Sequence, residues 1–240
     1  MRTSVRTGET SAEFDLAAPR YDLMVGLNPG YHDHLREAAT RLAERLPERA
    51  VDLLDLGCGS GASTRAMLDV VPPGHIRSLL GIDASRGMLA QAEAKLWPDG
   101  VRFAAGQAED VTDLVAAPVD GILAAYLFRN VARRDETVAA VHDVLVPGGT
   151  LVVQEYSVKG RLAAMLTWSV VCWLVVIPLA AITTRRTTLY RYLWRSVLRF
   201  DTVDEFTARL RRAGFTDIEV TTVGGWQRGI LHTIRARRPA

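Results

Sequence analysis

The stretch from Val51 to Thr64, VDLLDLGCGSGAST, consists of an apolar run, an acid, a glycine-rich loop and residues that can begin a helix. This order is typical of a β-strand that enters a tight turn, where glycines let the backbone approach a ligand in front of helix N-terminal amides. Gly57, Gly59 and Ala62 also satisfy the loose dinucleotide pattern G-x-G-x-x-G/A. The stretch therefore predicts a nucleoside-type cofactor, either a dinucleotide or S-adenosylmethionine.

Acidic residues near the loop favour S-adenosylmethionine. Asp55 lies two positions before the first glycine, and Gly61 completes a tighter Gly-x-Gly-x-Gly pattern that includes Cys58. A carboxylate at this position suits the ammonium and sulfonium groups of S-adenosylmethionine, whereas it would repel a pyrophosphate. The next predicted strand ends in Asp83, at the offset where a carboxylate accepts hydrogen bonds from ribose hydroxyls.

The third predicted strand supplies the adenine side of the pocket. Gln107, Ala108 and Glu109 follow this strand directly, and open α/β sheets bind ligands beyond the carboxyl ends of their strands. The Gln107 carbonyl can accept a hydrogen bond from the adenine amino group. Glu109 and Asp110 also fit an ordinary acidic pair at a helix N-terminus.

Composition agrees with one α/β domain. The chain has 240 residues, of which 48% are apolar and 23% charged, so it is long enough for a substantial core. The net charge of +2 gives no argument for nucleic acid, and two cysteines provide neither a disulfide framework nor a metal site. The N-terminus does not resemble a secretory signal, so we expect a cytoplasmic protein. Within the single domain 1–240 we expect N-terminal helices and a lid (1–48), a cofactor-binding core (49–157), an apolar insertion (158–200) and a last helix with a hairpin (201–240).

Strand and helix patterns alternate along the chain. Strands are predicted near 51–56, 78–82, 101–104, 119–125 and 150–156, and helices near 34–46, 62–70, 86–96 and 135–146. Such alternation predicts a doubly wound, mostly parallel sheet. Thr202 and Glu205 form a capping-box signature for a helix that ends at Gly214. Two last strands, Ile218–Val223 and Gly229–Ala236, complete seven strands.

The complete order of elements and a late turn resemble known methyltransferases. Five strand–helix units followed by a hairpin resemble the class I S-adenosylmethionine-dependent methyltransferase fold, in which the last strand is antiparallel. The Pro-Gly-Gly turn at 147–149, which precedes the strand TLVVQEY, resembles a late motif of that class. The apolar run at 162–182 adds a helical insertion before the sixth strand of this chain.

The segment 119–157 resembles one family more narrowly, the ubiquinone/menaquinone biosynthesis C-methyltransferases (UbiE/MenG). The matching features are Phe128-Arg129-Asn130, the Pro-Gly-Gly turn and Glu155-Tyr156-Ser157. RYDLM at 20–24 and LYRYLWRSVLRF at 189–200 extend the similarity to about residues 15–235. Two features depart from the family: the loop is Gly-Cys-Gly-Ser-Gly instead of Gly-Gly-Thr-Gly, and VTDLV replaces a Leu-Pro-Phe run.

The resemblance also implies roles for individual residues. Arg129 would stabilise a phenolate or enolate oxygen, Asn130 would position it, and His232 is the candidate general base. The alternatives are a salt bridge for Arg129 and a structural role for His232. Tyr21 is expected to close over the cofactor or simply to pack, and Tyr126 to line the pocket or the core. The predicted cofactor-binding residues are Tyr21, Asp55, Gly57, Cys58, Gly59, Gly61, Asp83, Ala84, Met88, Gln107, Ala108, Glu109 and Tyr126.

Residues 162–182, LAAMLTWSVVCWLVVIPLAAI, form 21 uncharged residues between basic flanks. Their length would allow a bilayer span, but a span would separate the last hairpin from its sheet, and Pro178 also disfavours it. The remaining interpretations are a buried lid helix, plain core packing, or an interfacial or re-entrant membrane segment, which Trp168 and Trp173 would suit. The arginine-rich stretch 185–199 has helical spacing, which favours a lid or membrane-facing helix over an RNA-binding segment.

The sequence thus predicts an S-adenosylmethionine-dependent methyltransferase for a lipophilic, quinone-like aromatic, working in the cytoplasm at the inner face of the cell membrane, with C-methylation favoured. Two alternatives remain: an O- or C-methyltransferase that tailors a secondary metabolite, and a cofactor-binding relative without methyl transfer. No metal or nucleic acid is expected. The oligomeric state is left open.

Overall fold

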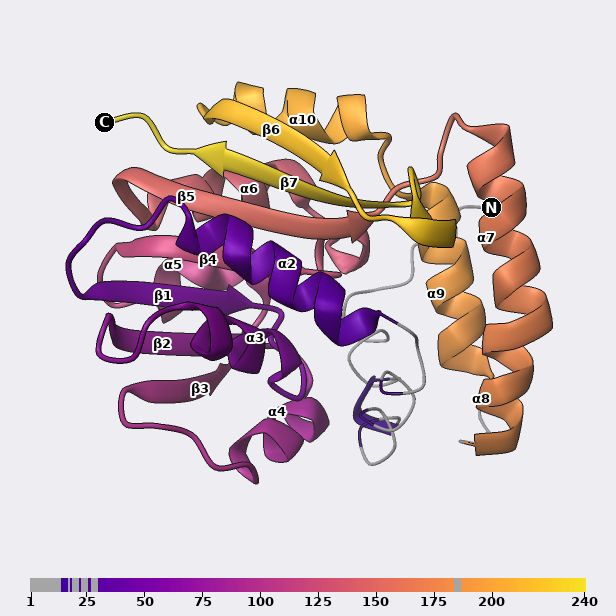
Figure 1. Cartoon of the computed structure of the whole chain (residues 1–240), viewed down its shortest axis with the longest axis horizontal. Coiled ribbons are helices and arrows are strands. Elements are labelled where there is room, and N and C mark those ends of the chain that lie inside the picture. The colour runs from indigo at the N-terminus through magenta and orange to yellow at the C-terminus, as the bar shows by residue number, and fades with distance from the viewer. Residues whose placement is uncertain (1–13, 17, 19–21, 23–25, 27–29, 184–186) are drawn as a thin grey trace.

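The computed structural model describes residues 14–16, 18, 22, 26, 30–183 and 187–240. Seven strands form one sheet in the order β3-β2-β1-β4-β5-β7-β6 (Figure 1). The strands are β1 (Val51–Leu56), β2 (Ile76–Asp83), β3 (Val101–Ala105), β4 (Val119–Ala125), β5 (Leu145–Tyr156), β6 (Thr216–Thr222) and β7 (Leu231–Arg237). Strands β1 to β5 are parallel, and β7 is antiparallel to both neighbours. The predicted doubly wound sheet with an antiparallel last strand is confirmed.

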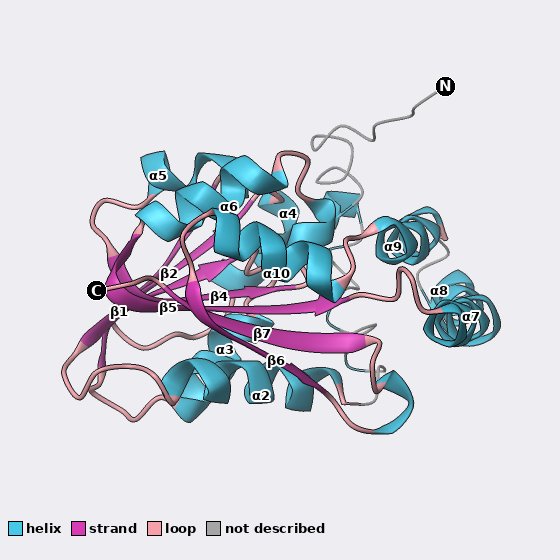
Figure 2. Cartoon of the chain, turned by 90° about the horizontal axis from the view of Figure 1, so that it is seen from above, coloured by secondary structure: helices cyan, strands magenta, loops and turns pink. Residues whose placement is uncertain are grey.

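Helices cover both faces of the sheet and its carboxyl edge. They are α2 (Tyr31–Ala43), α3 (Ala62–Val70), α4 (Arg86–Glu93), α5 (Val111–Leu114), α6 (Arg134–Asp143), α7 (Leu162–Val171), α8 (Ile177–Thr183), α9 (Thr188–Arg199) and α10 (Val203–Arg212). One face packs on α2 and α3, and the other on α5, α6 and α10 (Figure 2). A π-helical turn, Cys172–Val176, joins α7 to α8. These two helices and α9 lie beyond the carboxyl ends of the parallel strands, so the predicted helical insertion before β6 is confirmed.

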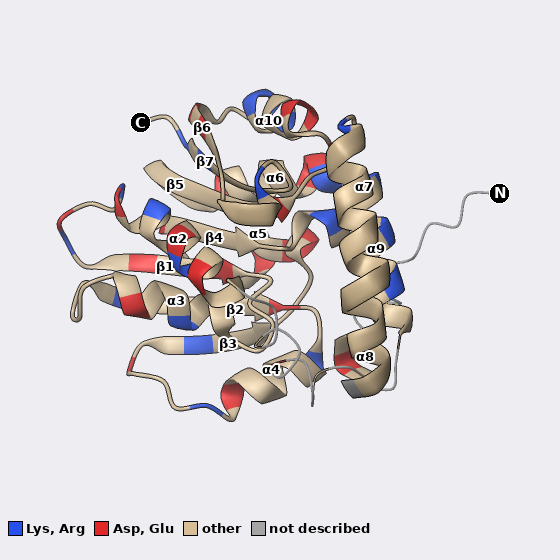
Figure 3. Cartoon of the chain, turned by 45° about the vertical axis from the view of Figure 1, so that its right-hand side comes forward, with Lys and Arg blue, Asp and Glu red and all other residues tan. Residues whose placement is uncertain are grey.

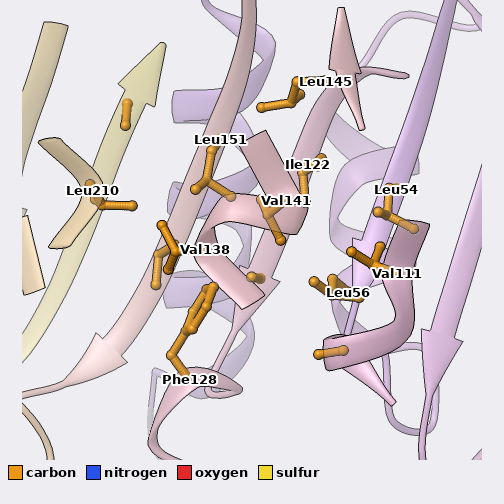
Figure 4. Packing of buried hydrophobic residues seen from close by; sticks show 14 of the residues in the cluster. Leu54, Leu56, Val111, Ile122, Phe128, Val138, Val141, Leu145, Leu151 and Leu210 are labelled. Carbon is orange, nitrogen blue, oxygen red and sulfur yellow. The ribbon is translucent and has the colours of Figure 1, made fainter. Parts of the chain in front are cut away.

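The two helical layers explain why the central strands are apolar on both faces. Leu54 and Leu56 of β1 pack with Phe128, Val138 and other side chains in the cluster beneath α5, α6 and α10 (Figure 4). Leu53, which directly precedes Leu54 in the sequence, lies in the opposite cluster with α2 and α3. Successive side chains of a strand point to opposite faces, so a strand covered on both sides is a continuous apolar run.

Element ends differ from the sequence-based ranges by a few residues. The helix expected over 34–46 spans Tyr31–Ala43, because the apolar repeat marks the buried face of a helix and not its ends. The strand expected to begin at Gly229 begins at Leu231, since Gly229 has a φ of +70° and belongs to the turn. Five other predicted elements are present with shifted ends. The range 78–82 corresponds to β2, 86–96 to α4, 135–146 to α6, 150–156 to β5 and 218–223 to β6.

The long apolar helix meets the length and composition expected of a membrane span. Leu162–Ile182 has a mean hydropathy of 2.2 in its most apolar window, of which 22% is buried in the protein. However, β5 before this helix and β7 after it pair in register from Thr150↔Arg237 to Tyr156↔Leu231. A single crossing would put these paired strands on opposite sides of the bilayer. The fold therefore agrees with the expectation that the helix does not simply span.

Candidate active site

A cavity of about 990 Å³, including the part open to solvent, lies at the carboxyl ends of β1, β2 and β4. The predicted site residues that line it are Gly57, Cys58, Gly59, Asp83, Ala84, Met88, Gln107, Ala108, Glu109, Tyr126, Arg129 and Asn130. Asp55, Gly61 and His232 do not line this cavity. Tyr21 lies outside the described residues.

The glycine loop is held against β2 by its own backbone. The amides of Gly57 and Cys58 donate to the Ile82 carbonyl at 2.7 and 3.1 Å. Gly57, Gly59 and Gly61 have φ of +79°, +53° and +88°, a region that favours glycine. A Cβ on Gly57 would lie 2.9 Å from Leu127 Cδ1. The turn therefore requires glycine for its conformation as well as for close approach.

Asp83 joins the glycine loop to the turn before α4. Its two carboxylate oxygens accept hydrogen bonds from the Gly59 and Ser85 amides, each at 2.8 Å. Burial raises the pKa of Asp83, and these amides partly oppose the shift. Each carboxylate oxygen can accept a second hydrogen bond. Asp83 therefore fixes the loop and still offers lone pairs toward a ligand hydroxyl in the cavity.

Asp55 lies behind the glycine loop. Ser63 Oγ and Thr64 Oγ1, in the first turn of α3, donate to its Oδ2 at 2.7 and 2.6 Å, whereas none of the described residues donates to Oδ1. Burial raises the pKa of Asp55 to about 6. The sequence predicted direct contact of Asp55 with the ligand, and this stays a prediction. In the structure the carboxylate holds the N-terminus of α3 beneath the loop.

The burial of Asp55 leads to a prediction of opposite effects on folding and binding. The pKa of Asp55 is raised in the folded state, so the protonated carboxyl group contributes to folding stability. This contribution is complete below pH 4 and is lost as the pH rises through about 6. Asp55→Asn removes the buried charge, so at pH 8 we expect the free energy of unfolding to increase by roughly 3 kcal/mol. We also expect weaker S-adenosylmethionine binding, because the negative charge beneath the loop is lost. Urea denaturation at pH 4 and 8, with calorimetric titration of the cofactor, measures both effects. A variant that is less stable than the wild type at pH 8 would contradict this assignment.

Arg129 and Glu155 form a buried ion pair at the wall of the cavity. Arg129, in the 3-10 turn Phe128–Asn130 after β4, is paired through its Nη1 with Glu155 Oε1, and the two side chains are 8% and 1% exposed. The Arg129 amide also donates to Glu155 Oε2 at 3.3 Å. The sequence left open a salt bridge from Arg129 to the cofactor or to a helix acid, whereas the partner in the structure is Glu155 of β5. Arg129 nevertheless lines the cavity, so it presents a fixed positive charge to a ligand.

Asn130 is held between two elements. Its Nδ2 donates to the Tyr126 carbonyl at 3.3 Å, and its Oδ1 accepts from the hydroxyl of Tyr192 on α9 at 3.1 Å. The apolar insertion is therefore tied directly to the site. No sequence pattern had connected Tyr192 with Asn130, because the two lie 62 residues apart.

Four aromatic rings extend from the cavity to α7. Tyr126 stacks on Tyr31 at 5.5 Å and on Tyr156 at 5.3 Å between ring centroids, and Tyr156 contacts Trp168 at 4.8 Å. Tyr126 has a φ of +58°, a strained conformation for a residue with a side chain. Its hydroxyl is buried and has no hydrogen-bond partner among the described residues, and burial raises its pKa well above the usual range. Tyr126 thus lines the cavity while its hydroxyl stays protonated and shielded from solvent.

His232 lies on β7 directly opposite Glu155 of β5. Burial lowers its pKa, so the ring is neutral at physiological pH, and its Nε2 has no hydrogen-bond partner in the part of the chain that the structure describes. These properties suit a base, but His232 does not line the cavity. A role as general base stays a prediction, and it requires the acceptor to extend beyond the lining described above.

The N-terminal segment supplies residues that the sequence analysis missed. Phe14 lines the cavity, and Asp15 accepts hydrogen bonds from Ser85 Oγ at 2.5 Å and from the Gly87 amide at 2.8 Å. Asp22 accepts from Ser60 Oγ in the glycine loop and pairs with Lys95 Nζ at 2.7 Å. Two carboxylates from this segment therefore attach it to the loop and to the region of α4. The only signal in the sequence was the predicted N-terminal lid.

Other loop residues shape the pocket and do not react. Burial raises the pKa of the Cys58 thiol well above its usual range, so it is not a nucleophile at neutral pH. Glu109 Oε1 accepts from the Ala132 amide at 3.2 Å, so it joins the adenine side of the cavity to the segment after Asn130. Together with Asp83, Gln107 and the glycine loop, which line the same cavity, these residues form a donor and acceptor set that fits a nucleoside.

Comparisons with known proteins agree with this site. The model of the ubiE/COQ5 methyltransferase family matches residues 3–233. The chain is 32% identical to demethylmenaquinone methyltransferase of Thermus thermophilus, over 85% of this chain and 91% of that protein. It is 31% identical to the ubiquinone/menaquinone biosynthesis C-methyltransferase UbiE of Syntrophotalea carbinolica, over 91% of each.

A solved structure shares the fold. The N-methyltransferase NodS from Bradyrhizobium japonicum, in complex with S-adenosylhomocysteine, superimposes with a TM-score of 0.65 at 18% identity, covering 96% of this chain and 99% of that one. At this identity the likeness concerns the fold alone. The family match over nearly the whole chain is decisive, and the protein belongs to the ubiE/COQ5 methyltransferase family, whose methyl donor is S-adenosylmethionine.

Proposed function

We propose that this enzyme methylates a carbon atom of a lipophilic, quinone-like aromatic at the cytoplasmic face of the cell membrane. The observation that carries the proposal is a single cavity whose wall includes both the glycine loop and the Arg129–Asn130 pair. The methyl donor and the methyl acceptor would therefore bind in the same cavity. Curated relatives at 31–32% identity are named for methylation in quinone biosynthesis, which supports this acceptor class.

The side of the cavity next to the glycine loop would bind and orient S-adenosylmethionine. When bound, S-adenosylmethionine supplies an electrophilic methyl group on a sulfonium. We assign the ribose hydroxyls to Asp83, the adenine edge to Gln107 and Ala108, and the amino-acid end to the amides of the loop from Gly57 to Gly61. Met88 and Cys58 fill the remaining apolar wall. Phe14 contributes to the same wall and helps to exclude water.

The acceptor side stabilises charge. Deprotonation of a hydroquinone gives a phenolate, which makes a ring carbon nucleophilic. The Arg129 guanidinium is held in place by Glu155, so it can stabilise the phenolate oxygen without having to reorganise. We assign Asn130 to orienting the acceptor ring, which can stack against Tyr126 and the neighbouring aromatic side chains. The chemical step then requires mainly alignment and exclusion of water.

The apolar helix supports a membrane location. Only 22% of its most apolar window is buried, which argues against plain core packing. Trp168 lies at the inner side of this helix against Tyr156, while Trp173 is 44% exposed on the outer side. We infer that 162–182 walls the acceptor pocket and also contacts the membrane surface, where a prenylated quinol would be dissolved.

Methyl-deuterated S-adenosylmethionine tests the proposed function. Purified enzyme is incubated with a prenylated hydroquinone that has one unsubstituted ring position. We expect a product heavier by one deuterated methyl group, with loss of the ring proton signal and both hydroxyls retained. A deuterated methyl ether would show O-methylation instead, and absence of any labelled quinol would contradict the acceptor class.

A further inference from the structure

The outer side of α7–α8 is an extended apolar surface. Leu174 and Ile182 are 73% and 78% exposed, and within the described part of the chain nothing covers them. We define the apolar face as Leu162, Leu166, Val170, Trp173, Leu174, Val175 and Ile182, each at least 44% exposed. A contiguous apolar surface on one helix is uncommon in a protein that contacts only water.

The charge around the apolar face is strongly one-sided. Residues 157–200 contain seven Lys and Arg and no Asp or Glu, whereas the whole chain has a net charge of only +2. The remaining residues therefore carry a net charge of −5. The positive charge of this protein is concentrated on the segment that holds the exposed apolar side chains.

Part of this charge forms a stripe on α9, which packs beside α7–α8. Arg191, Arg195 and Arg199 recur every four residues, are all exposed, and have no carboxylate partner among the described residues. The Arg191 guanidinium lies 5.7 Å from the centroid of the Trp173 ring, so the stripe borders the apolar face. Figure 3 shows the charged positions of α9 next to the uncharged ribbon of α7–α8.

We propose that this surface docks on a bilayer containing anionic lipids, with the apolar face at the headgroup–acyl boundary and the arginine stripe on the lipid phosphates. The inference rests on the proposed membrane contact and adds the lipid class and the orientation. Amphipathic surfaces with basic borders bind membranes by burying apolar area to about 5–10 Å and by attracting anionic lipid. Trp173, beside Arg191, suits the interface between these layers.

A second copy of the chain is a less suitable occupant. A twofold dimer places the same patch on both sides of the interface. It would therefore bring the arginine stripes and the other basic residues of two copies together, with no acid in 157–200 to compensate them. An anionic bilayer supplies the opposite charge.

Docking in this orientation places the acceptor side of the cavity next to lipid. Trp168 of α7 contacts Tyr156, and Tyr192 of α9 donates to Asn130 in the cavity wall. Both helices of the docking surface thus contact residues of the acceptor site. A lipophilic acceptor would travel only from the bilayer to the adjoining wall and would not cross water.

Vesicle sedimentation tests the proposal with full-length enzyme. We expect wild type to bind phosphatidylglycerol-containing vesicles far more tightly than pure phosphatidylcholine. We expect the triple variant Arg191→Gln, Arg195→Gln, Arg199→Gln to lose roughly 100-fold in partition to the anionic vesicles. The charge-matched control replaces Arg77, Arg102 and Arg237 by Gln. These exposed residues lie at the opposite, amino-terminal edge of the parallel strands, so the control should bind within about twofold of wild type.

Three outcomes would overturn the proposal. Equal losses of vesicle binding in both triple variants would show that only the net charge of the protein matters. Equal binding of wild type to anionic and to neutral vesicles would show that the surface does not recognise anionic lipid. Dimerisation without vesicle binding would assign the apolar face to a second copy. Methyl transfer by the wild type to a short-chain quinol without vesicles is measured in parallel, so failure of docking is separated from failure of the proposed reaction.

Discussion

Replacing Arg129 by Gln lowers kcat at least about 100-fold, while the affinity for S-adenosylhomocysteine stays within about threefold. The guanidinium is the positive charge in the wall on the acceptor side of the cavity, so its loss removes stabilisation of a developing phenolate. The same change leaves Glu155, 1% exposed, without its cationic partner. Breaking a buried pair in this way costs about 3–5 kcal/mol, so the variant should also be strongly destabilised.

The double variant Arg129→Gln, Glu155→Gln separates these two effects. It removes both charges, so the unfolding free energy should largely recover, whereas kcat should remain as low as in the single variant. Rates are measured by product formation at saturating cofactor, and stability by urea denaturation. Recovery of activity together with stability would show that Arg129 has only a structural role.

Replacing Gly57 by Ala weakens S-adenosylmethionine binding on the order of 100-fold, equivalent to about 2.7 kcal/mol. The new Cβ would lie 2.9 Å from Leu127 Cδ1, and Leu127 lines the cavity. Relief of this contact moves either Leu127 or the loop into the space that the cofactor requires. Calorimetric titration of the cofactor measures the loss.

Gly74 provides a matched control for Gly57. It has a φ of +81°, against +79° for Gly57, but a Cβ there meets no atom within 4 Å. Gly74→Ala therefore has the same backbone strain without the contact in the cavity. We expect similar destabilisation of both variants but normal cofactor binding in Gly74→Ala. Equal weakening of binding in the two variants would attribute the effect to global destabilisation.

Much of the fold could be predicted because its signals are local. The apolar run before Gly57 marks a central strand, and Thr202 with Glu205 forms the predicted capping box at the start of α10. The mostly parallel direction of the strands follows from their alternation with helices. Element ends were less accurate, since Gly229 leaves the strand through its backbone conformation, which no apolar pattern reports.

The site was harder to predict because its contacts join distant segments. The aromatic series comes from α2, the end of β4, the end of β5 and α7, so the sequence gives no spacing that would reveal it. The Arg129–Glu155 pair likewise depends on the register of β4 and β5. Asp55 was predicted to contact the ligand, but its position behind the loop involves the hydroxyls of Ser63 and Thr64, which no spacing pattern reports.

The dependence of kcat/KM on the prenyl tail of the acceptor tests the central claim, methyl transfer to a lipophilic quinone-like ring, most directly. A series of hydroquinones with the same ring and zero, one, two or three isoprene units is assayed in detergent below its critical micelle concentration. We predict that kcat/KM increases at least about tenfold from the unprenylated ring to the prenylated ones, because tail burial against the insertion stabilises the complex. Equal or higher values for the unprenylated ring, or turnover of none of the series, would contradict the account.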